Sequence, residues 1–185
     1  MADTDLCVGG SGGPLILLQA STVPQWQGAS DFENSLMNGG DVETDYDVIC
    51  EGVGAKEFCV IPRHGREMLV LWDSVFGATL LQPQSLSPSP GTLVLMHCYS
   101  ADDLSAILPK MQERVRRGDP DFSLPFNVEE TTLRLQVGAD SSEPSYDYKY
   151  LDVPVLPGSR RCYAYLIKLD GYSDVVVIID EPRAD

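Results

Sequence analysis

The run Val-Val-Val-Ile-Ile at residues 175–179 limits the fold more than any other feature of the sequence. Five branched apolar residues without polar alternation are typical of a strand that is buried on both faces. Segment 162–169 and the turn-forming residues 170–174 precede this run, so the three together predict a closing β-hairpin. The fold must therefore contain at least one strand with apolar packing on each side.

Other short apolar segments, bounded by turn residues, extend this β pattern. The sequence Arg-His-Gly-Arg at 63–66 places glycine where a tight turn needs positive φ, which predicts a second hairpin around it. Segment 92–99 is almost entirely apolar and predicts a central strand. Including the closing hairpin, the expected strands are residues 14–18, 57–62, 67–72, 76–82, 92–99, 133–137, 162–169 and 175–179.

Residues 100–117 have the pattern of one principal amphipathic helix. Ser100 is placed as its N-cap with Asp103 in the capping-box position, and Gly118 is placed to end it. Pro109 inside the pattern predicts a kink or a division into two helices. The apolar stripe consists of Leu104, Ile107, Leu108, Met111 and Val115. We expect an α+β fold, a mainly antiparallel β-sheet of roughly six to eight strands with this helix packed on a face.

The length of 185 residues suits a single domain with one continuous core. The glycine-rich start predicts a flexible N-terminal arm over residues 1–10, followed by one domain over residues 11–185. No run of about 18 apolar residues occurs, and the first residues lack the basic and apolar regions of a secretory signal. We therefore expect a cytoplasmic protein with no membrane span.

The acidic charge is unevenly distributed along the chain. The net charge is −15, and residues 1–62 hold ten acidic residues and one basic residue. Residues 63–117 are nearly neutral, whereas residues 118–185 are again acidic. Such a surface repels nucleic acid and anionic lipid and attracts cationic partners. The expected partner is therefore a protein, with neither nucleic acid nor membrane.

The cysteines and histidines provide little support for catalysis. The five cysteines form no CxxC pair and are odd in number, so we expect buried free thiols. His97 and Cys98 are neighbours on a predicted strand and point to opposite faces, which prevents them from forming a dyad. His64 lies in the predicted hairpin turn, and its alternative partners for a cysteine–histidine pair are Cys98 and Cys59. We name no catalytic residue and do not expect an enzyme.

Asp41, Glu43, Asp45 and Asp47 place an acid at every second position. On a strand these carboxylates would share one wet face, and at a helix start several would favour the positive end of the dipole. The series is similar to the start of a calcium loop, but Tyr46 takes the place of the required glycine, and the twelfth-position glutamate is also missing. With thiols and imidazoles scattered singly, we expect no metal and no cofactor.

Several segments together resemble the immunity protein 21 family. The opening Ser-Gly-Gly-Pro-Leu strand at 11–18 and the Trp-containing turn at 24–28 are similar to its start. Asp-Tyr-Asp-Val-Ile-Cys at 45–50 resembles its next segment, and the hairpin at 60–73 and the strand at 79–81 follow in the family's order. The resemblance covers roughly residues 11–115, while the loops at 83–91 and 118–157 are longer than the family's pattern.

Members of that family neutralise cognate toxins of bacterial polymorphic toxin systems, so the resemblance implies inhibition by direct binding of a toxin protein. A basic nuclease domain is one candidate for that toxin, and the oligomeric state stays open. The first alternative is an acidic adaptor or chaperone, and the second is a small cysteine- or carboxylate-dependent hydrolase. Trp26 is expected to be structural. The candidate partner-binding residues are Asp41, Glu43, Asp45, Tyr46, Asp47 and Glu51.

Overall fold

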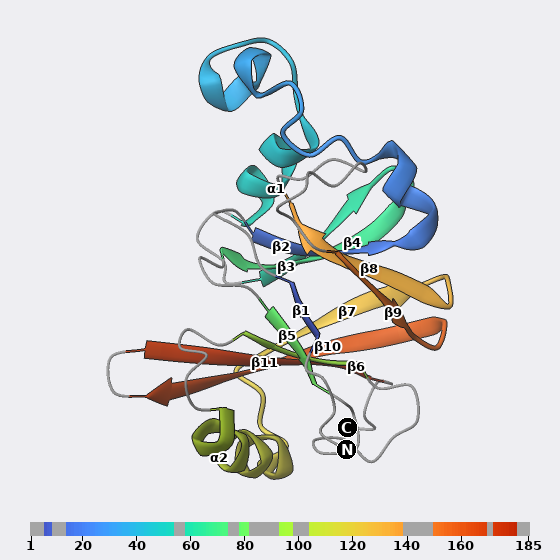
Figure 1. The fold of residues 1–185 in the computed structure, drawn as a ribbon. Helices are drawn as coiled ribbons and strands as arrows, with labels where there is room; N and C mark the ends of the chain where they lie inside the picture. The colour runs from blue at the N-terminus through green and yellow to red at the C-terminus, as the bar shows by residue number, and fades with distance from the viewer. Residues whose placement is uncertain are drawn as a thin grey trace.

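The described residues form four layers, in which two antiparallel β-sheets pack face to face and a helix lies on the outer side of each (Figure 1). Helix α1 (Asp45–Val53) lies above one sheet, and helix α2 (Leu104–Arg117) lies below the other. The computed structural model describes residues 6–8, 14–53, 58–73, 78–81, 93–97, 104–138, 150–169 and 172–180.

All strand pairs within the two sheets are antiparallel, so the fold is α+β and mainly antiparallel β, as predicted. Sheet A consists, in spatial order, of β1 (Leu6–Val8), β5 (Ala78–Leu81), β6 (Leu93–His97), β11 (Tyr172–Asp180), β10 (Gly158–Leu169) and β7 (Phe122–Val128). Sheet B consists of β3 (Phe58–Arg63), β4 (Arg66–Asp73), β2 (Pro14–Gln19), β8 (Thr132–Val137) and β9 (Leu151–Pro154). Short 3₁₀ helices are η1 (Ala20–Gln25), η2 (Phe32–Asn34) and η3 (Leu36–Asn38).

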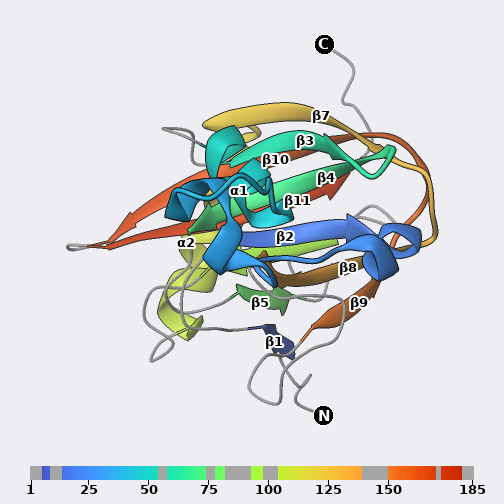
Figure 2. The same cartoon turned by 90° about the horizontal axis from the view of Figure 1, so that it is seen from above.

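Strand β2 runs through the middle of sheet B, and all of its residues are buried. Its side chains alternate between the two faces, as they do along any strand. Leu15 and Leu17 enter the core between the sheets, whereas Ile16 and Leu18 lie on the opposite face. Sheet A covers the first face, and η1 and α1 cover the second (Figure 2).

Two separate clusters of apolar side chains result from this arrangement. The cluster between the sheets draws on both of them and includes Phe126, Leu135, Cys162 and Ile179. The cluster above sheet B is built around Trp26, Ile49, Met68 and their neighbours. Burying each large apolar side chain stabilises the fold by about 1.5–3 kcal/mol, so both clusters contribute strongly.

Gln19, at the end of β2, joins the two sheets at one edge. Its buried side-chain amide donates to the carbonyl oxygen of Asn127 at 2.9 Å and accepts from the backbone N–H of Glu129 at 3.2 Å. Glu67 of β4 also accepts from the backbone N–H of Asn127 at 2.6 Å. Because β7 belongs to sheet A, these hydrogen bonds tie its end to sheet B.

Helix α2 packs on β10 and ends at Gly118, as predicted. Its residue Met111 is completely buried, and its last turn carries the basic residues Arg114, Arg116 and Arg117. The helix is continuous through Pro109, so the predicted division into two helices is wrong. Ser100 and Asp103 lie outside the described residues, as do the side chains of Leu104, Ile107 and Leu108.

Both predicted hairpins are present, β3–β4 and β10–β11. The turn between β3 and β4 consists of His64 and Gly65, whose φ angles of 52° and 76° are both left-handed. That combination suits a two-residue turn matched to the twist of the strands. Of the alternating acids of residues 41–47, Asp45 and Asp47 lie in the first turn of α1, whereas Asp41 and Glu43 precede the helix.

The structure also contains strands that sequence analysis did not identify, and it has two sheets where one was expected. Strand β7 contains Pro125, which is tolerated because β7 is an edge strand. Strand β9 is a four-residue edge strand that ends at Pro154. Strand β1 lies within residues 1–10, the predicted flexible arm, and pairs with β5.

We expect Met111→Ala to lower the free energy of unfolding by about 2–5 kcal/mol, because it leaves a cavity between α2 and sheet A. Lys110→Ala, at the exposed neighbouring position, is the control and should change stability by no more than about 0.5 kcal/mol. Urea unfolding monitored by circular dichroism measures both. Equal stability of the two variants would mean that α2 does not contribute to the core.

Candidate partner-binding site

Residues 28–43 project from the end of the molecule that carries α1, beyond sheet B, and we call them the apical lobe (Figure 1). The lobe contains η2 and η3 and leads directly into α1. It belongs to a stretch, residues 14–53, that holds seven acidic residues and no basic residue. Five of those acids are exposed: Asp31, Glu33, Asp41, Glu43 and Glu51.

Backbone hydrogen bonds hold the lobe in one conformation. Leu36 N–H donates to the carbonyl oxygen of Val42, and Val42 N–H donates to that of Asn34, both at 3.0 Å. The buried Ser35 hydroxyl caps η3 by accepting from Asn38 N–H. The backbone at Gly40 passes so close to Asn34 that an added Cβ would lie 2.0 Å from its carbonyl oxygen, which requires glycine there.

Asp47 connects the lobe to the start of α1. Its Oδ2 accepts from the backbone N–H of Thr44 at 2.7 Å, and its own N–H donates to Thr44 Oγ1 at 3.1 Å. This reciprocal pair is a capping box with aspartate at the third helical position. The other carboxylate oxygen, Oδ1, accepts from the backbone N–H of Met37 at 3.1 Å. One buried carboxylate therefore secures both the helix and the lobe.

The hydrogen bonds to Asp47 also change its acidity. Burial acts to raise the pKa of the Asp47 carboxyl, but hydrogen bonds from Thr44, Met37 and Leu36 outweigh it, and the pKa is lowered from 3.8. Asp47 is therefore ionised at neutral pH, which suits its place in the first turn of the helix.

Asp45 connects the base of the lobe to the β3–β4 turn. Its Oδ1 lies 2.7 Å from Arg63 Nε and 3.1 Å from His64 Nε2, while Oδ2 accepts from the backbone N–H of Gln27 at 2.7 Å. Burial lowers the pKa of Arg63, but its contacts with Asp45 and then Glu43 outweigh burial and raise that pKa. The Asp45 charge is thus compensated inside the protein.

Trp26 completes this support from below. It is buried, contacts His64 edge-on with ring centroids 6.3 Å apart, and donates its indole N–H to the carbonyl oxygen of Gly138. The structural role predicted for Trp26 is confirmed. Its ring holds the turn that presents Arg63 and His64 to Asp45.

The six candidate contact residues therefore differ in their exposure. Asp45 and Asp47 are only 3% and 6% exposed, and their carboxylates are engaged inside the protein. We correct their assignment from partner contact to support of the lobe. Tyr46 is half-buried. The three that remain exposed are Asp41, Glu43 and Glu51.

The exposed residues of the lobe itself are not among the sequence-predicted contact residues. Asp31 and Glu33 add two exposed acids to that set. Leu36 and Met37 gave no signal either, because two apolar residues among polar ones have no periodicity that assigns them to core or surface.

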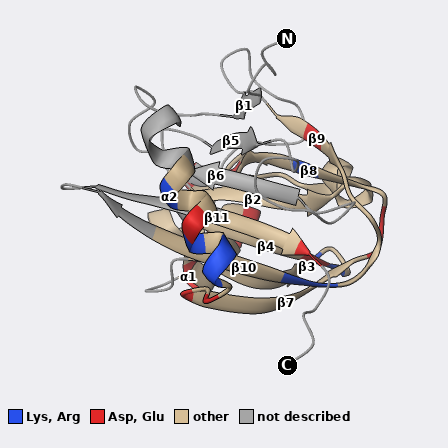
Figure 3. Ribbon diagram, turned by 90° about the horizontal axis from the view of Figure 1, so that it is seen from below, with Lys and Arg blue, Asp and Glu red and all other residues tan. Residues whose placement is uncertain are grey.

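Helix α2 lies at the end of the molecule opposite the lobe (Figure 1), and its basic residues are blue in Figure 3. This helix carries four basic residues and one acidic residue. Arg116 and Arg117 both contact Glu113, and these hydrogen bonds lower the pKa of its carboxyl. Arg114 contacts Asp121 at 2.8 Å. Helix α2 thus has an excess of basic residues, most of them paired with acids, whereas the lobe holds only acidic residues.

The cysteines described are not arranged for chemistry. Cys59 and Cys162 are buried, as expected, whereas Cys50 is only half-buried. Burial raises the pKa of the Cys162 thiol far above its ordinary value, so it stays protonated. Cys98 and the side chain of Cys7 lie outside the described residues. Within the described ranges, no group of three or more potential metal ligands occurs.

Comparison with protein-family models, with curated proteins and with solved structures finds no match. Among the residues that the structure describes, no helix has the length and hydropathy needed to cross a bilayer.

We expect Asp47→Asn to lower the free energy of unfolding at neutral pH, because a neutral amide cannot replace the carboxylate in the hydrogen bonds that it accepts from Thr44 and Met37. The folded-state pKa of Asp47 is lowered from 3.8, so its contribution is complete above that value and is lost as pH falls through the lowered folded pKa. The stability difference between wild type and variant should therefore shrink below about pH 4.

Urea titrations from neutral pH to about pH 2 measure this difference. Asp41→Asn, an exposed carboxylate of the same lobe, is the control and should stay within about 0.5 kcal/mol of wild type. A difference for Asp47→Asn that is unchanged across the acid range would contradict the role given to its charge.

Proposed function

We propose that this protein is an immunity protein that binds a cognate toxin of a bacterial polymorphic toxin system in the cytoplasm and neutralises it. The resemblance of residues 11–115 to the immunity protein 21 family supports the function. The apical lobe and α1 support the proposed mode of inhibition, in which the protein directly covers a basic surface of the toxin.

The observation that carries this proposal is the exposed acid at one end of the molecule. Residues 14–53 contain no base that could neutralise their five exposed carboxylates from within the same stretch. Arg63 contacts Glu43 at 3.3 Å, but its closer contact is with the buried Asp45. Acidic surfaces of this kind attract basic proteins, including the cationic surfaces with which nucleases hold their substrates.

The charge difference between the two ends would also orient the protein as it approaches a toxin. A cationic surface attracts the acidic lobe and not α2, whose arginines are paired with acids, so productive encounters become more frequent. An immunity protein benefits from such steering, because it must capture the toxin before the toxin reaches its target. Steering of this kind is sensitive to salt.

The proposal predicts co-purification with the toxin domain encoded beside the gene, and rescue of cells that express this domain. Its association rate constant should fall as salt rises. The triple variant Glu33→Lys, Asp41→Lys and Glu51→Lys should reduce this rate constant about tenfold or more at low salt, because like charges then face each other.

Stopped-flow fluorescence measures the rate constants, and growth assays measure protection. Asp119→Lys, at an exposed acid beyond the end of α2, is the matched control and should leave the rate constant nearly unchanged. An association rate constant that changes neither with salt nor in the triple variant would show that the acidic surface is not the contact with the toxin. Binding without loss of toxin activity would favour an adaptor or chaperone.

A further inference from the structure

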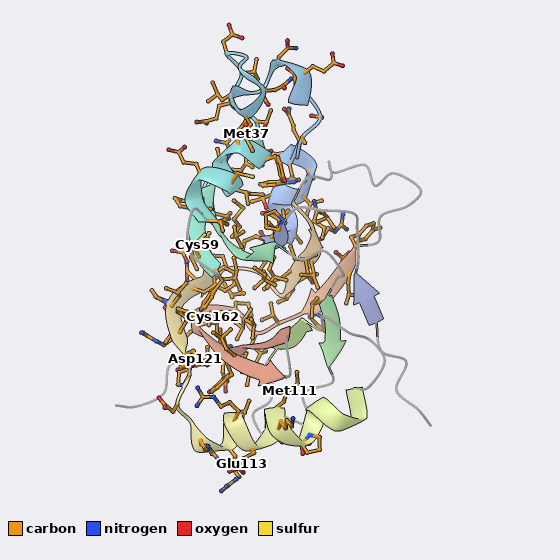
Figure 4. The ribbon with its side chains drawn as sticks, turned by 90° about the vertical axis from the view of Figure 1, so that its left-hand side faces the viewer. Met37, Cys59, Met111, Glu113, Asp121 and Cys162 are labelled. Atoms are coloured by element: carbon orange, nitrogen blue, oxygen red, sulfur yellow. The ribbon has the colours of Figure 1, made fainter. Side chains whose placement is uncertain are left out.

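The apical lobe exposes large apolar side chains. Leu36, Met37 and Val42 are 51%, 55% and 38% exposed, and Figure 4 shows Met37 in the part of the lobe that lies beside α1. We call these three residues the apolar tip. Of the six large apolar side chains that are exposed in the described part of the chain, three belong to it. Exposed apolar side chains gathered at one place mark interaction sites.

The apolar tip is held rigidly although its side chains face solvent. Leu36 N–H donates to the carbonyl oxygen of Val42, which fixes these two residues side by side. The backbone N–H of Met37 donates to the buried Asp47 carboxylate. A partner would therefore meet side chains whose backbone is already in place, so little conformational entropy is lost on binding.

The surroundings of the tip define what can cover it. Glu33, Asp41 and Glu43 are exposed within the same lobe. The lobe of a second copy would place acid against acid, and the arginines of its α2 are already paired with Glu113 and Asp121. An anionic lipid surface would meet the same repulsion as a second lobe. A basic protein surface meets none. Charge complementarity therefore selects a protein partner with an apolar pocket rimmed by lysine or arginine.

We propose that Leu36, Met37 and Val42 are the anchor of the binding surface and enter an apolar pocket with a basic rim on the partner. This inference rests on the binding role proposed above and identifies the residues that carry its affinity. Apolar anchors in a pocket, with polar groups around them, contribute most of the binding energy in protein interfaces. Methionine suits such an anchor because its flexible thioether adapts to the shape of the pocket.

Methionine methyl NMR on the full-length chain tests this anchor. Met37 is the reporter, and the buried Met68 and Met111 are controls within the same spectrum. Two probes are used: the neighbouring toxin domain, and a synthetic amphipathic helix with leucine on one face and lysine on the other. With each probe, the Met37 signal should shift saturably, while those of Met68 and Met111 stay in place.

Leu36→Ser should weaken binding of each probe about tenfold or more, because an anchor side chain typically contributes more than 1 kcal/mol. Leu156→Ser is the matched control, since Leu156 is 47% exposed outside the lobe, and it should bind like wild type. Thermal unfolding of both variants confirms that they are folded, as expected for substitutions of exposed side chains.

The outcomes separate this inference from the proposed function. If the Met37 signal does not shift in a saturated toxin complex, or if Leu36→Ser binds with full affinity, the proposed anchor is wrong and the immunity function still stands. A Met37 response to the peptide without binding of the toxin domain supports the anchor and overturns the immunity function. Failure to bind either probe overturns both.

Discussion

Burial of β2 on both faces is the constraint on which the other layers depend. An apolar strand in the middle of a sheet must be covered above and below, and a single sheet with one helix would leave one of its faces in water. Sheet A covers Leu15 and Leu17, and Trp26 and Ile49 cover Ile16 and Leu18. The segment between β2 and β3 is therefore required as a lid on sheet B. The apical lobe extends from this lid.

The lobe adds a second constraint, which is the placement of two carboxylates inside the protein. A buried charge is costly unless hydrogen bonds and opposite charges compensate it. Asp47 accepts hydrogen bonds from Thr44 at the start of α1 and from Met37 in the lobe, and Asp45 meets Arg63, His64 and a backbone N–H. Each carboxylate joins segments that are separate in the sequence. The charges at the base of the lobe thus provide the rigidity with which it presents its exposed residues.

Predictions from sequence succeeded where one local pattern determines the structure. The turn at His64 and Gly65, the end of α2 at Gly118 and the hairpin of β10 and β11 all follow from nearby residues. The predictions failed where a strand is stabilised by residues that are distant in the sequence. Strand β7 contains a proline and is stabilised by β10 and by Gln19, which lies more than 100 residues earlier in the chain. No local pattern contains that information.

The same limit explains the outcome at the candidate site. The alternating acids from Asp41 to Asp47 were recognised, but alternation does not distinguish carboxylates that face solvent from those that accept buried hydrogen bonds. Asp45 is engaged inside the protein because the fold brings Arg63 and His64 of the hairpin into contact with it. The exposure of Leu36 and Met37 likewise depends on the position of the lobe beyond the sheet.

In the proposed role, the two kinds of exposed residue act at different steps of binding. Charges act over about 10 Å at moderate salt, so the carboxylates of the lobe influence the approach and the association rate. Apolar contacts act only after water has left, so Leu36, Met37 and Val42 influence the lifetime of the complex. A rigid lobe serves both steps, because it holds the apolar tip where the acids have already directed the partner. The buried Asp47 accepts a hydrogen bond from the backbone N–H of Met37. This one side chain therefore holds both the acidic lobe and the apolar tip in position.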